Sequence, residues 1–486
     1  MFCWNRHKTK RRFGLNRHNT ADETEKSSNQ FCRGFAGASG VPHRSHMLLM
    51  RALYSAAWWA ALPLVLARLW WRGRKEPGYR QHWGERLGFY RGISGDRRGP
   101  MTAGNAQLTA GNAPLIWVHA VSVGETRAAE PLIDALLAGY PDHTILLTHM
   151  TPTGRATGQA LFGKHAPRVR QCYLPYDTGF MAGRFIRHFA PSVCVLMETE
   201  VWPNLIAQCV RHRVPVALVN ARLSERSLAK ARRLPGLMTE AALGISCVAA
   251  QTEADAARVR QFGVRNVEVT GSIKFDVTPP ETALIRGAQL RAQFGSRPVL
   301  LCASTREGEE ALILDAMREP QLQRTLVVIV PRHPQRFDEV ARMVAARGMT
   351  VSRRSSLGEA LLGTDVRVFL GDSMGEMFAY YAACDIAFIG GSLLPLGGQN
   401  LIEACALGKP VLIGPHTFNF GPVSEDAIEA GAALRVPDAP AMLDQAARLL
   451  QTEDARAEMG AKAKSFAQQH RGATMRTIAL LQTLIK

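Results

Sequence analysis

A carboxylate stands at a position where a buried strand is expected to pass into a helix. In the stretch VHAVSVGETRAAEP, Glu125 follows an apolar run over residues 114–118 and opens the helical pattern ETRAAEPLIDALL. Two roles suit an acid at this junction. It can cap the helix by accepting from unpaired N–H groups at the positive end of the dipole. It can also serve as a general base at the mouth of a cleft.

A loop in the second half carries residue types that suit a nucleotide. In GGSLLPLGGQNLIEACALGKPVLIGP (390–415), Gly397 and Gly398 would let the backbone approach a ligand closely. Asn400 opens a helical pattern whose first N–H groups attract anions. Glu403 could accept two hydrogen bonds from ribose hydroxyls, although an acid in a first turn also complements the dipole without a ligand. Together these features favour a nucleotide site.

Polar residues also follow other apolar runs of the chain. The charged residues that stand out in these loops are Glu198, Glu200, Lys274, Arg306 and Arg332. In α/β proteins the loops after the strands carry the chemistry. We therefore expect these side chains to gather at the carboxyl ends of the strands.

The elements that must position these residues alternate between strand and helix. In the first half the expected strands are PLIWVHA, HTILLTHM, VCVLMETE, PVALVNARLS, CVAAQT and VEVTGSIKF. In the second half they are PVLLCAST, TLVVIVPRH, VRVFLGD, IAFIGGS, PVLIGP and AALRVPD. Continuous apolar strands separated by helices indicate parallel sheets covered on both faces. The pattern predicts an α/β protein of two Rossmann-like domains that face a cleft, with the boundary in the proline-bearing piece at 275–283.

Several enzyme classes lack their motifs here. The sequence has no Walker A pattern, no GxGxxG after the first strand, no plausible Ser-His-Asp elbow of GxSxG type and no HExxH pair. The nine cysteines are scattered singly, which favours buried free thiols over disulfides or structural zinc. The formal net charge of +18 suits a polyanionic partner, either nucleic acid, anionic lipid or a phosphorylated substrate.

The N-terminal part divides into two segments. Residues 1–46 are polar and basic without periodicity, and we expect a disordered extension that could lie upstream of a true start at Met47. Residues 47–75 contain an apolar stretch flanked by tryptophans and followed by basic residues, which favours a membrane anchor, spanning or interfacial, with the main body in the cytoplasm. A buried core helix is the alternative.

Six ordered motifs resemble a known family. VSVGETRA, ETEVWPN, NARLSERS, GSIKFD, PRHPQRF and GGQNLIEACALGKPVLIGPHTFNF are similar to the 3-deoxy-D-manno-octulosonic acid (Kdo) transferases of Gram-negative bacteria, over a match from about residue 47 to the C-terminus. The resemblance implies a GT-B fold on the cytoplasmic face of the inner membrane. It also implies inverting transfer of Kdo from CMP-Kdo to a lipid A precursor (lipid IVA), without a metal or other cofactor. Gln399 stands where many members have a histidine.

The resemblance also assigns roles to residues. It implies that Glu125 is the general base, that Glu198 or Glu200 lies near the acceptor, and that Glu403 binds the ribose. Lys274 and Arg332 match cationic positions near the CMP. Arg306 and the helix after Asn400 could add to the stabilisation of the leaving phosphate. Glu198 and Glu200 could instead order Arg222 or cap the following helix.

The domains follow from the same match. Residues 76–276 would bind the acceptor and residues 277–486 would bind CMP-Kdo. Attraction to anionic lipids of the inner membrane would explain part of the protein's positive charge.

Two alternatives remain. The chain could be another GT-B enzyme that uses a UDP-sugar, as a transferase or an epimerase. It could also be a basic nucleic-acid binder, which is disfavoured because residues 1–46 supply +6 of the charge, from nine Lys and Arg against three Asp and Glu, and no recognised nucleic-acid module is visible.

Overall fold

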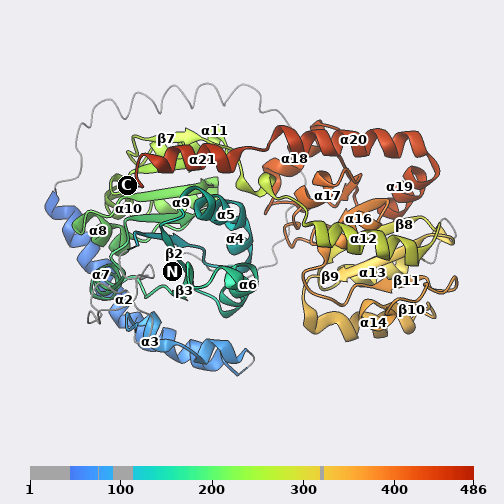
Figure 1. Ribbon diagram of the computed structural model, residues 1–486, viewed down its shortest axis with the longest axis horizontal. Coiled ribbons are helices and arrows are strands. Elements are labelled where there is room, and N and C mark those ends of the chain that lie inside the picture. Colours follow the sequence, from blue (N-terminus) through green and yellow to red (C-terminus); the bar gives the residue numbers. More distant parts are fainter. Residues whose placement is uncertain (1–43, 75, 91–112, 318–321, 486) are drawn as a thin grey trace, which may run out of the picture.

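Two lobes lie side by side, and each is built on a parallel sheet (Figure 1). The computed structural model describes residues 44–74, 76–90, 113–317 and 322–485. The first sheet has the strand order β3-β2-β1-β4-β5-β6-β7. Its strands are β1 Leu115–His119, β2 Thr144–His149, β3 Val169–Tyr173, β4 Val193–Met197, β5 Val216–Ala221, β6 Cys247–Ala250 and β7 Val267–Val269.

The second sheet has a similar plan, except that β11 lies between β9 and β10 instead of on the far side of the reversal point. Its order is β10-β11-β9-β8-β12-β13-β14. Its strands are β8 Val299–Thr305, β9 Leu326–Pro331, β10 Val351–Arg353, β11 Val368–Leu370, β12 Ile386–Ile389, β13 Val411–Ile413 and β14 Ala433–Arg435. The central strands of both sheets are buried on both faces, since helices cover each side.

Helices connect the strands in both domains. In and before the first domain they are α2 Arg44–Arg72, η1 Pro77–Arg80, α3 Trp83–Arg86, α4 Val123–Ala128, α5 Glu130–Gly139, α6 Pro152–Phe162, η2 Gly163–His165, α7 Gly179–Phe189, α8 Pro203–Arg211, α9 Glu225–Ala231, α10 Pro235–Leu243, α11 Glu253–Arg260 and η3 Ile273–Asp276. After it they are α12 Glu281–Phe294, α13 Glu309–Ala316, η5 Pro334–Arg336, α14 Phe337–Ala345, α15 Arg354–Leu357, α16 Met377–Ala383, α17 Ile402–Ala406, α18 Gly421–Glu429, α19 Ala439–Gln451, α20 Glu453–Gln469 and α21 Ala473–Gln482.

Each sheet has a point where the strand order reverses. In the first sheet this point lies between β1 and β4, and in the second it lies between β8 and β12. The chain leaves these paired strands in opposite directions, so a crevice opens beyond their carboxyl ends, where doubly wound proteins bind ligands. The loops after β1, β4, β8 and β12 are therefore the places to look for a site.

The strands expected from the sequence are confirmed, and two were missed. The first is β3, in which Arg170 and Gln171 interrupt the apolar run and lie partly exposed. The second is β10, which has three residues, Val351–Arg353, none of them fully buried. Both are edge strands. An edge strand needs less apolar surface than a central one, so its sequence signal is weak.

The C-terminal helix corrects the expected division of the chain at residue 277. α21 leaves the second domain after α20 and packs on the first, where Ile478 and Leu481 join the core beside β1 (Figure 1). The carboxylate of Asp276 accepts from the backbone N–H groups of Gly472 and Thr474, which fixes the point of return. Residues 473–485 thus belong to the first domain, although they follow the second in sequence.

The helix α2 lies along the first domain (Figure 1). Trp58, Leu66 and Leu69 pack against Tyr176 and Met181, whereas other large apolar side chains of α2 remain exposed. Leu48–Arg72 is long and apolar enough to cross a membrane, with a mean hydropathy of 1.3. The extension expected over residues 1–46 lies outside the described residues, except for the first turn of α2. The seven cysteines that the structure describes are free and buried, as the sequence predicts.

Candidate active site

Glu125 lies at the reversal point of the first sheet, in the first turn of α4. One carboxylate oxygen accepts from the backbone N–H of Val121 at 2.9 Å, and the other accepts from the hydroxyl of Ser122 at 3.0 Å. The carboxylate therefore fixes the turn that precedes α4, although neither partner is one of the unpaired helix N–H groups that the capping interpretation names. These contacts also hold the group in a fixed position beyond the end of β1.

The surroundings of Glu125 also change its acidity. Burial, together with the negative charges of Glu200 and Glu198, raises the pKa of Glu125 to about 8. The hydrogen bonds from Val121 and Ser122 act in the opposite direction and do not prevail. A carboxylate whose pKa lies near neutrality is suited to accept a proton from a substrate.

Glu198 and Glu200 follow β4, on the other side of the reversal point. The carboxylate of Glu198 forms an ion pair with the ammonium of Lys274 at 2.7 Å, and its backbone is left-handed at φ 57°. Glu200 is buried and accepts from the indole N–H of Trp202 at 2.9 Å. The structure thus brings the three acids predicted from sequence to one crevice, with Lys274 beside them.

Lys274 is held by a residue that the sequence analysis did not single out. The buried side chain of Asn220, at the end of β5, accepts from the backbone N–H of Ile273 at 3.2 Å. Its backbone is left-handed, with φ at 52°. Beyond Lys274 lies the second domain, since the ammonium stands 5.6 Å from the centre of the Phe420 ring. Lys274 therefore lies where the two domains meet.

The second crevice gathers positive charge. Arg306 follows β8 and Arg332 follows β9. Burial, together with the charges of Arg127 and Arg306, holds the pKa of Arg332 below its usual value. Arg127 comes from α4 of the first domain, two residues after Glu125, and sequence reasoning did not assign it a role. Three guanidinium groups that repel one another form a site that an anion would stabilise.

Glu403 lies among these cations. Burial raises its pKa, whereas Arg127, a hydrogen bond from Asn400 and Arg332 act to lower it. The amide of Asn400 donates to the carboxylate of Glu403 at 3.2 Å, and its oxygen accepts from the N–H of Ile402 at 3.0 Å. One first-turn N–H group is therefore already bonded within the protein. The helix expected to begin at Asn400 is α17, which begins at Ile402 and has five residues, so it offers less to an anion than predicted.

Gly397 and Gly398 serve the loop itself in this structure. Both adopt positive φ, at 95° and 73°, which favours glycine. A side chain at Gly397 would collide with Asn419 and Phe418. The glycines let the loop after β12 pack closely against residues 418–419.

Two buried acids that the sequence analysis left without a role build this crevice. The carboxylate of Glu309 accepts from the backbone N–H groups of Arg306, Gly391 and Leu393, at 2.9, 2.6 and 2.9 Å. It thereby joins the loops after β8 and β12. The carboxylate of Glu310 accepts from Thr305 at 2.9 Å and pairs with Arg336 at 3.1 Å. The available signal was a pair of acids at the start of a helix directly after a buried strand.

Arg222 connects the two crevices. Its guanidinium donates to the carbonyl oxygens of Asn419 and Phe418, at 2.6 and 3.3 Å. The described contacts of Arg222 thus reach across to the second domain. Arg127 also acts across the gap on Glu403. The acids of the first domain and the cations of the second therefore belong to one site.

No group of three or more metal-ligating side chains gathers within the residues that the structure describes. The expectation of a reaction without a cofactor remains a prediction.

The fold and the site define a class of protein. Two doubly wound domains that face each other with their reversal points are the GT-B arrangement of glycosyltransferases. UDP-GlcNAc 2-epimerase from Neisseria meningitidis, solved with UDP-GlcNAc, has a TM-score of 0.53 at 14% identity and covers 76% of this chain and 100% of its own. At that identity the likeness shows the fold alone.

Sequence comparisons give the family. Residues 81–277 match the family model of 3-deoxy-D-manno-octulosonic-acid transferase (kdotransferase), and residues 332–466 match that of glycosyl transferases group 1. The Kdo transferase of Bordetella pertussis is 46% identical over 89% of this chain and 99% of its own length. That of Haemophilus influenzae is 35% identical over 90% and 99%. The chain belongs to the Kdo transferase family and is a glycosyltransferase of lipopolysaccharide biosynthesis.

Proposed function

We propose that the protein transfers Kdo from CMP-Kdo to a lipid A precursor with inversion at the anomeric carbon, and that Glu125 is the general base. The observation that carries the proposal is the separation of charge between the crevices. Glu125, Glu198 and Glu200 lie on one side, and Arg306 and Arg332 lie on the other. An inverting displacement needs this arrangement, a base at the attacking hydroxyl and positive charge at the leaving phosphate.

The reaction would proceed in one displacement. Glu125 removes the proton from a sugar hydroxyl of the acceptor, and the oxygen attacks the anomeric carbon of Kdo. The bond from that carbon to the phosphate oxygen of CMP breaks, and CMP leaves with the electron pair. A base whose pKa is about 8 is matched to a reaction near neutral pH, because it is strong enough to accept the proton and partly ionised beforehand.

The cations would hold the donor. Arg306, Arg332 and Arg127 can form charge-assisted hydrogen bonds to the single phosphate of CMP. Lys274 can add a further charge once it leaves Glu198, its partner at 2.7 Å. Glu403, beside Arg332, is placed to accept from ribose hydroxyls. With several cations at one phosphate, no metal ion is needed to neutralise the leaving group.

A groove against α2 would hold the acceptor. It offers about 520 Å³, and its lining includes Val121 and Glu200, the neighbours of Glu125. On the other side it is lined by α2, including Trp58, Arg68 and Arg72. Apolar and cationic side chains in one groove suit a phosphorylated lipid, and α2 is long enough to sit in the bilayer that supplies it. We place the enzyme on the cytoplasmic face of the inner membrane, where anionic lipids would meet its basic surface.

Product analysis tests this function. Detergent-solubilised protein is incubated with a tetra-acylated lipid A precursor and either CMP-Kdo or a UDP-sugar, and mass spectrometry counts the sugars added. We expect Kdo addition from CMP-Kdo only, and competition by CMP but not by UDP. Transfer from a UDP-sugar, or salt-sensitive binding of DNA without any transfer, would overturn the proposal.

A further inference from the structure

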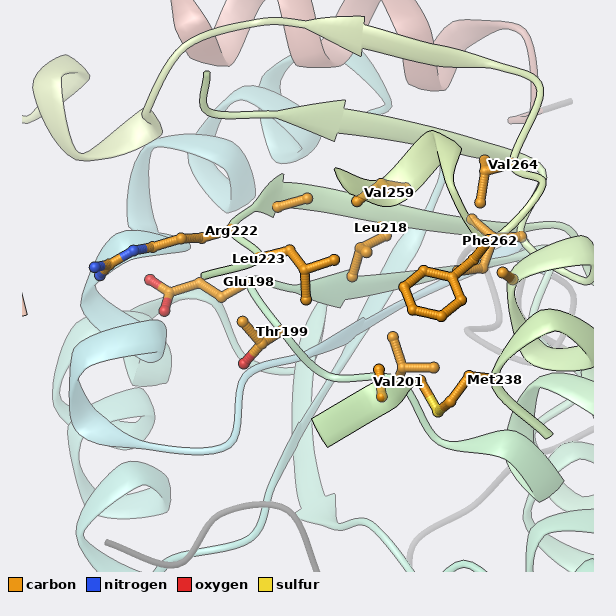
Figure 2. Close-up of a pocket in the computed structure, with 14 residues that line it drawn as sticks. Glu198, Thr199, Val201, Leu218, Arg222, Leu223, Met238, Val259, Phe262 and Val264 are labelled. Atoms are coloured by element: carbon orange, nitrogen blue, oxygen red, sulfur yellow. The ribbon is translucent and has the colours of Figure 1, made fainter. Parts of the chain in front are cut away.

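A second, smaller cavity lies inside the first domain behind the acids of the site. Figure 2 shows the polar ends of Glu198 and Arg222 pointing away from the apolar side chains that fill the rest of its wall. The wall comprises Glu198, Thr199, Val201, Leu218, Ala221, Arg222, Leu223, Ala231, Met238, Ala242, Ile245, Val259, Phe262 and Val264. These residues come from β5, α9, α10 and α11 and from the loops that follow β4, β5, α10 and α11. The cavity is therefore an apolar hollow with a charged mouth.

The cavity shares one side with the acceptor groove. The residues that line both are Thr199, Val201, Leu223, Ala231 and Met238. The wall between the two spaces is thus a single layer of side chains, all but one of them apolar. Methionine is unbranched and adapts its shape readily, so Met238 can yield to a chain that enters from the groove.

The wall between the cavity and the acceptor groove is also connected to α2. Arg51 of α2 forms an ion pair with Glu240 of α10, the helix that carries Met238 and Ala242. The groove on the near side of the wall holds the cations Arg68 and Arg72. A lipid that leaves the bilayer along α2 would therefore meet positive charge suited to its phosphates and, directly behind, an apolar space.

We propose that this cavity holds the end of one acyl chain of the lipid acceptor. The inference rests on the proposed function and adds an acyl subsite to it. The cavity offers about 60 Å³ to the centres of water-sized groups. A single water requires roughly 10–15 Å³ on this measure, so there is room for about four methylene-sized groups. Water gains little in an apolar space with few polar partners, whereas a hydrocarbon chain gains by leaving water.

The subsite would place the sugar. A chain that passes the wall at Leu223 and Met238 runs beside the loop of Glu198 and Glu200. The headgroup of the same lipid is then held against Val121, whose backbone N–H binds Glu125. Seating the chain end therefore fixes how far the acceptor hydroxyl lies from the base, and the enzyme would favour acceptors whose chain fits.

Filling the cavity tests the subsite. Val264→Phe adds a ring to the wall away from the charged mouth. Val214→Phe is the matched control, because Val214 is buried to a similar degree in the same core but lines neither space. KM is measured for the tetra-acylated precursor and for its fully de-acylated bisphosphorylated backbone. We expect Val264→Phe to raise the ratio of the KM for the tetra-acylated precursor to the KM for the de-acylated backbone by roughly tenfold or more, since excluding about two methylene groups from an apolar site weakens binding by that factor.

The control variant should leave that ratio at the wild-type value. An unchanged ratio in Val264→Phe protein that melts like the control would overturn the subsite. If wild type adds Kdo equally well to both acceptors, the subsite also fails while the proposed function stands. If wild type adds Kdo to neither, the proposed function itself fails.

A second test does not depend on the fold of the filled variant. A lipid A precursor with a photoreactive group at the end of one acyl chain is cross-linked to the wild-type protein in detergent. We expect labelled peptides from residues 235–264, which carry α10, α11 and the cavity wall beyond them. Labelling confined to α2 would show that the chain stays outside the cavity and would overturn the proposal.

Discussion

The two crevices share one topology and carry opposite charge. In the first domain the loops after β1 and β4 bring Glu125, Glu198 and Glu200 together, and burial together with these negative charges raises the pKa of Glu125. In the second domain the loops after β8 and β9 bring Arg306 and Arg332 together, and burial together with the charges of Arg127 and Arg306 lowers the pKa of Arg332. Each crevice holds like charges close to one another. The fold supplies two equivalent positions, and the residues at the strand ends decide what each position binds.

The difference has a chemical meaning. Repulsion among the acids is relieved when Glu125 takes up a proton, and repulsion among the arginines is relieved when a phosphate binds. In the proposed reaction, an acceptor hydroxyl would provide the proton and the departing CMP would provide the phosphate. Removing the essential charge from either crevice should therefore impair the reaction. The two kinds of variant should differ in which kinetic parameter changes, kcat or KM.

The largest effect is expected for Glu125→Gln. The amide oxygen can still accept from the backbone N–H of Val121, and the amide N–H can donate to the hydroxyl oxygen of Ser122. The amide cannot accept a proton, so kcat should fall by roughly 10²–10⁴-fold, the usual contribution of a general base. KM for CMP-Kdo should change little, because the proposed donor site lies in the other crevice. Initial rates with a tetra-acylated precursor over a range of donor concentrations separate the two parameters.

Stability provides a check on the Glu125→Gln variant. Because burial raises the pKa of Glu125 from 4.5 to about 8, the folded protein favours the protonated form and loses stability as the pH rises from 4.5 to 8. The glutamine variant lacks that loss, so its melting temperature at pH 8 should be at least that of wild type. Glu225→Gln, a change at an exposed acid of the same domain, serves as the activity control. Normal transfer by Glu125→Gln would return Glu125 to a capping role only.

A smaller effect with the opposite kinetic pattern is expected for Arg332→Ala. Loss of one charge-assisted hydrogen bond to the donor phosphate should raise KM for CMP-Kdo by roughly 10–100-fold, since such a bond is worth about 1.5–3 kcal/mol. Arg324→Ala removes an exposed arginine just before β9, the strand that Arg332 follows, and the kinetics of this variant should match wild type. Steady-state kinetics at varied CMP-Kdo concentration give kcat and the donor KM for each variant. A variant that loses kcat without any rise in donor KM would place Arg332 outside the donor site.

A positioning effect is expected for Glu309→Ala. The change leaves the N–H groups of Gly391 and Leu393 without their partner, at a cost of about 1–3 kcal/mol for each buried donor. The melting temperature should fall, and KM for CMP-Kdo should rise by roughly tenfold because the loops after β8 and β12 separate. Glu307→Ala, at the exposed neighbouring acid, is the matched control. Calorimetry and donor kinetics measured together test it, and a fall in stability without a change in donor KM would show that Glu309 supports the fold only.

The sequence predicted the fold and most of the site because both depend on strand ends. Long apolar runs identify the central strands, and the polar residues that follow them must lie at the sheet edge. Glu125, Glu198, Glu200, Arg332 and Glu403 were singled out as candidates in this way, and their roles remain predictions. This reasoning does not predict the position of α21, because the return of α21 to the first domain depends on a contact between Asp276 and residues nearly two hundred positions later.

Other features depend on contacts between loops that no local pattern records. Glu309 joins two loops about eighty residues apart, and Arg127 reaches the second domain from a helix of the first. The apolar cavity of Figure 2 is formed by residues from 198 to 264, none of them unusual by itself. Only the assembled domain shows that the acids have an apolar space behind them.

The smallest effect is expected in the pH dependence, and it isolates the repulsion among the acids. Glu125 is protonated below its raised pKa and accepts a proton only above it, so kcat/KM should rise with pH and level off above about 8. Glu200→Gln removes the negative charge that raises the pKa of Glu125 more than Glu198 does, while an amide oxygen can still accept from Trp202. The rising limb should then move to lower pH, and Glu198→Gln should move it less. Profiles measured from pH 5 to 10 at saturating donor report this shift, and a limb that stays in place in both variants would mean that burial alone raises the pKa of Glu125.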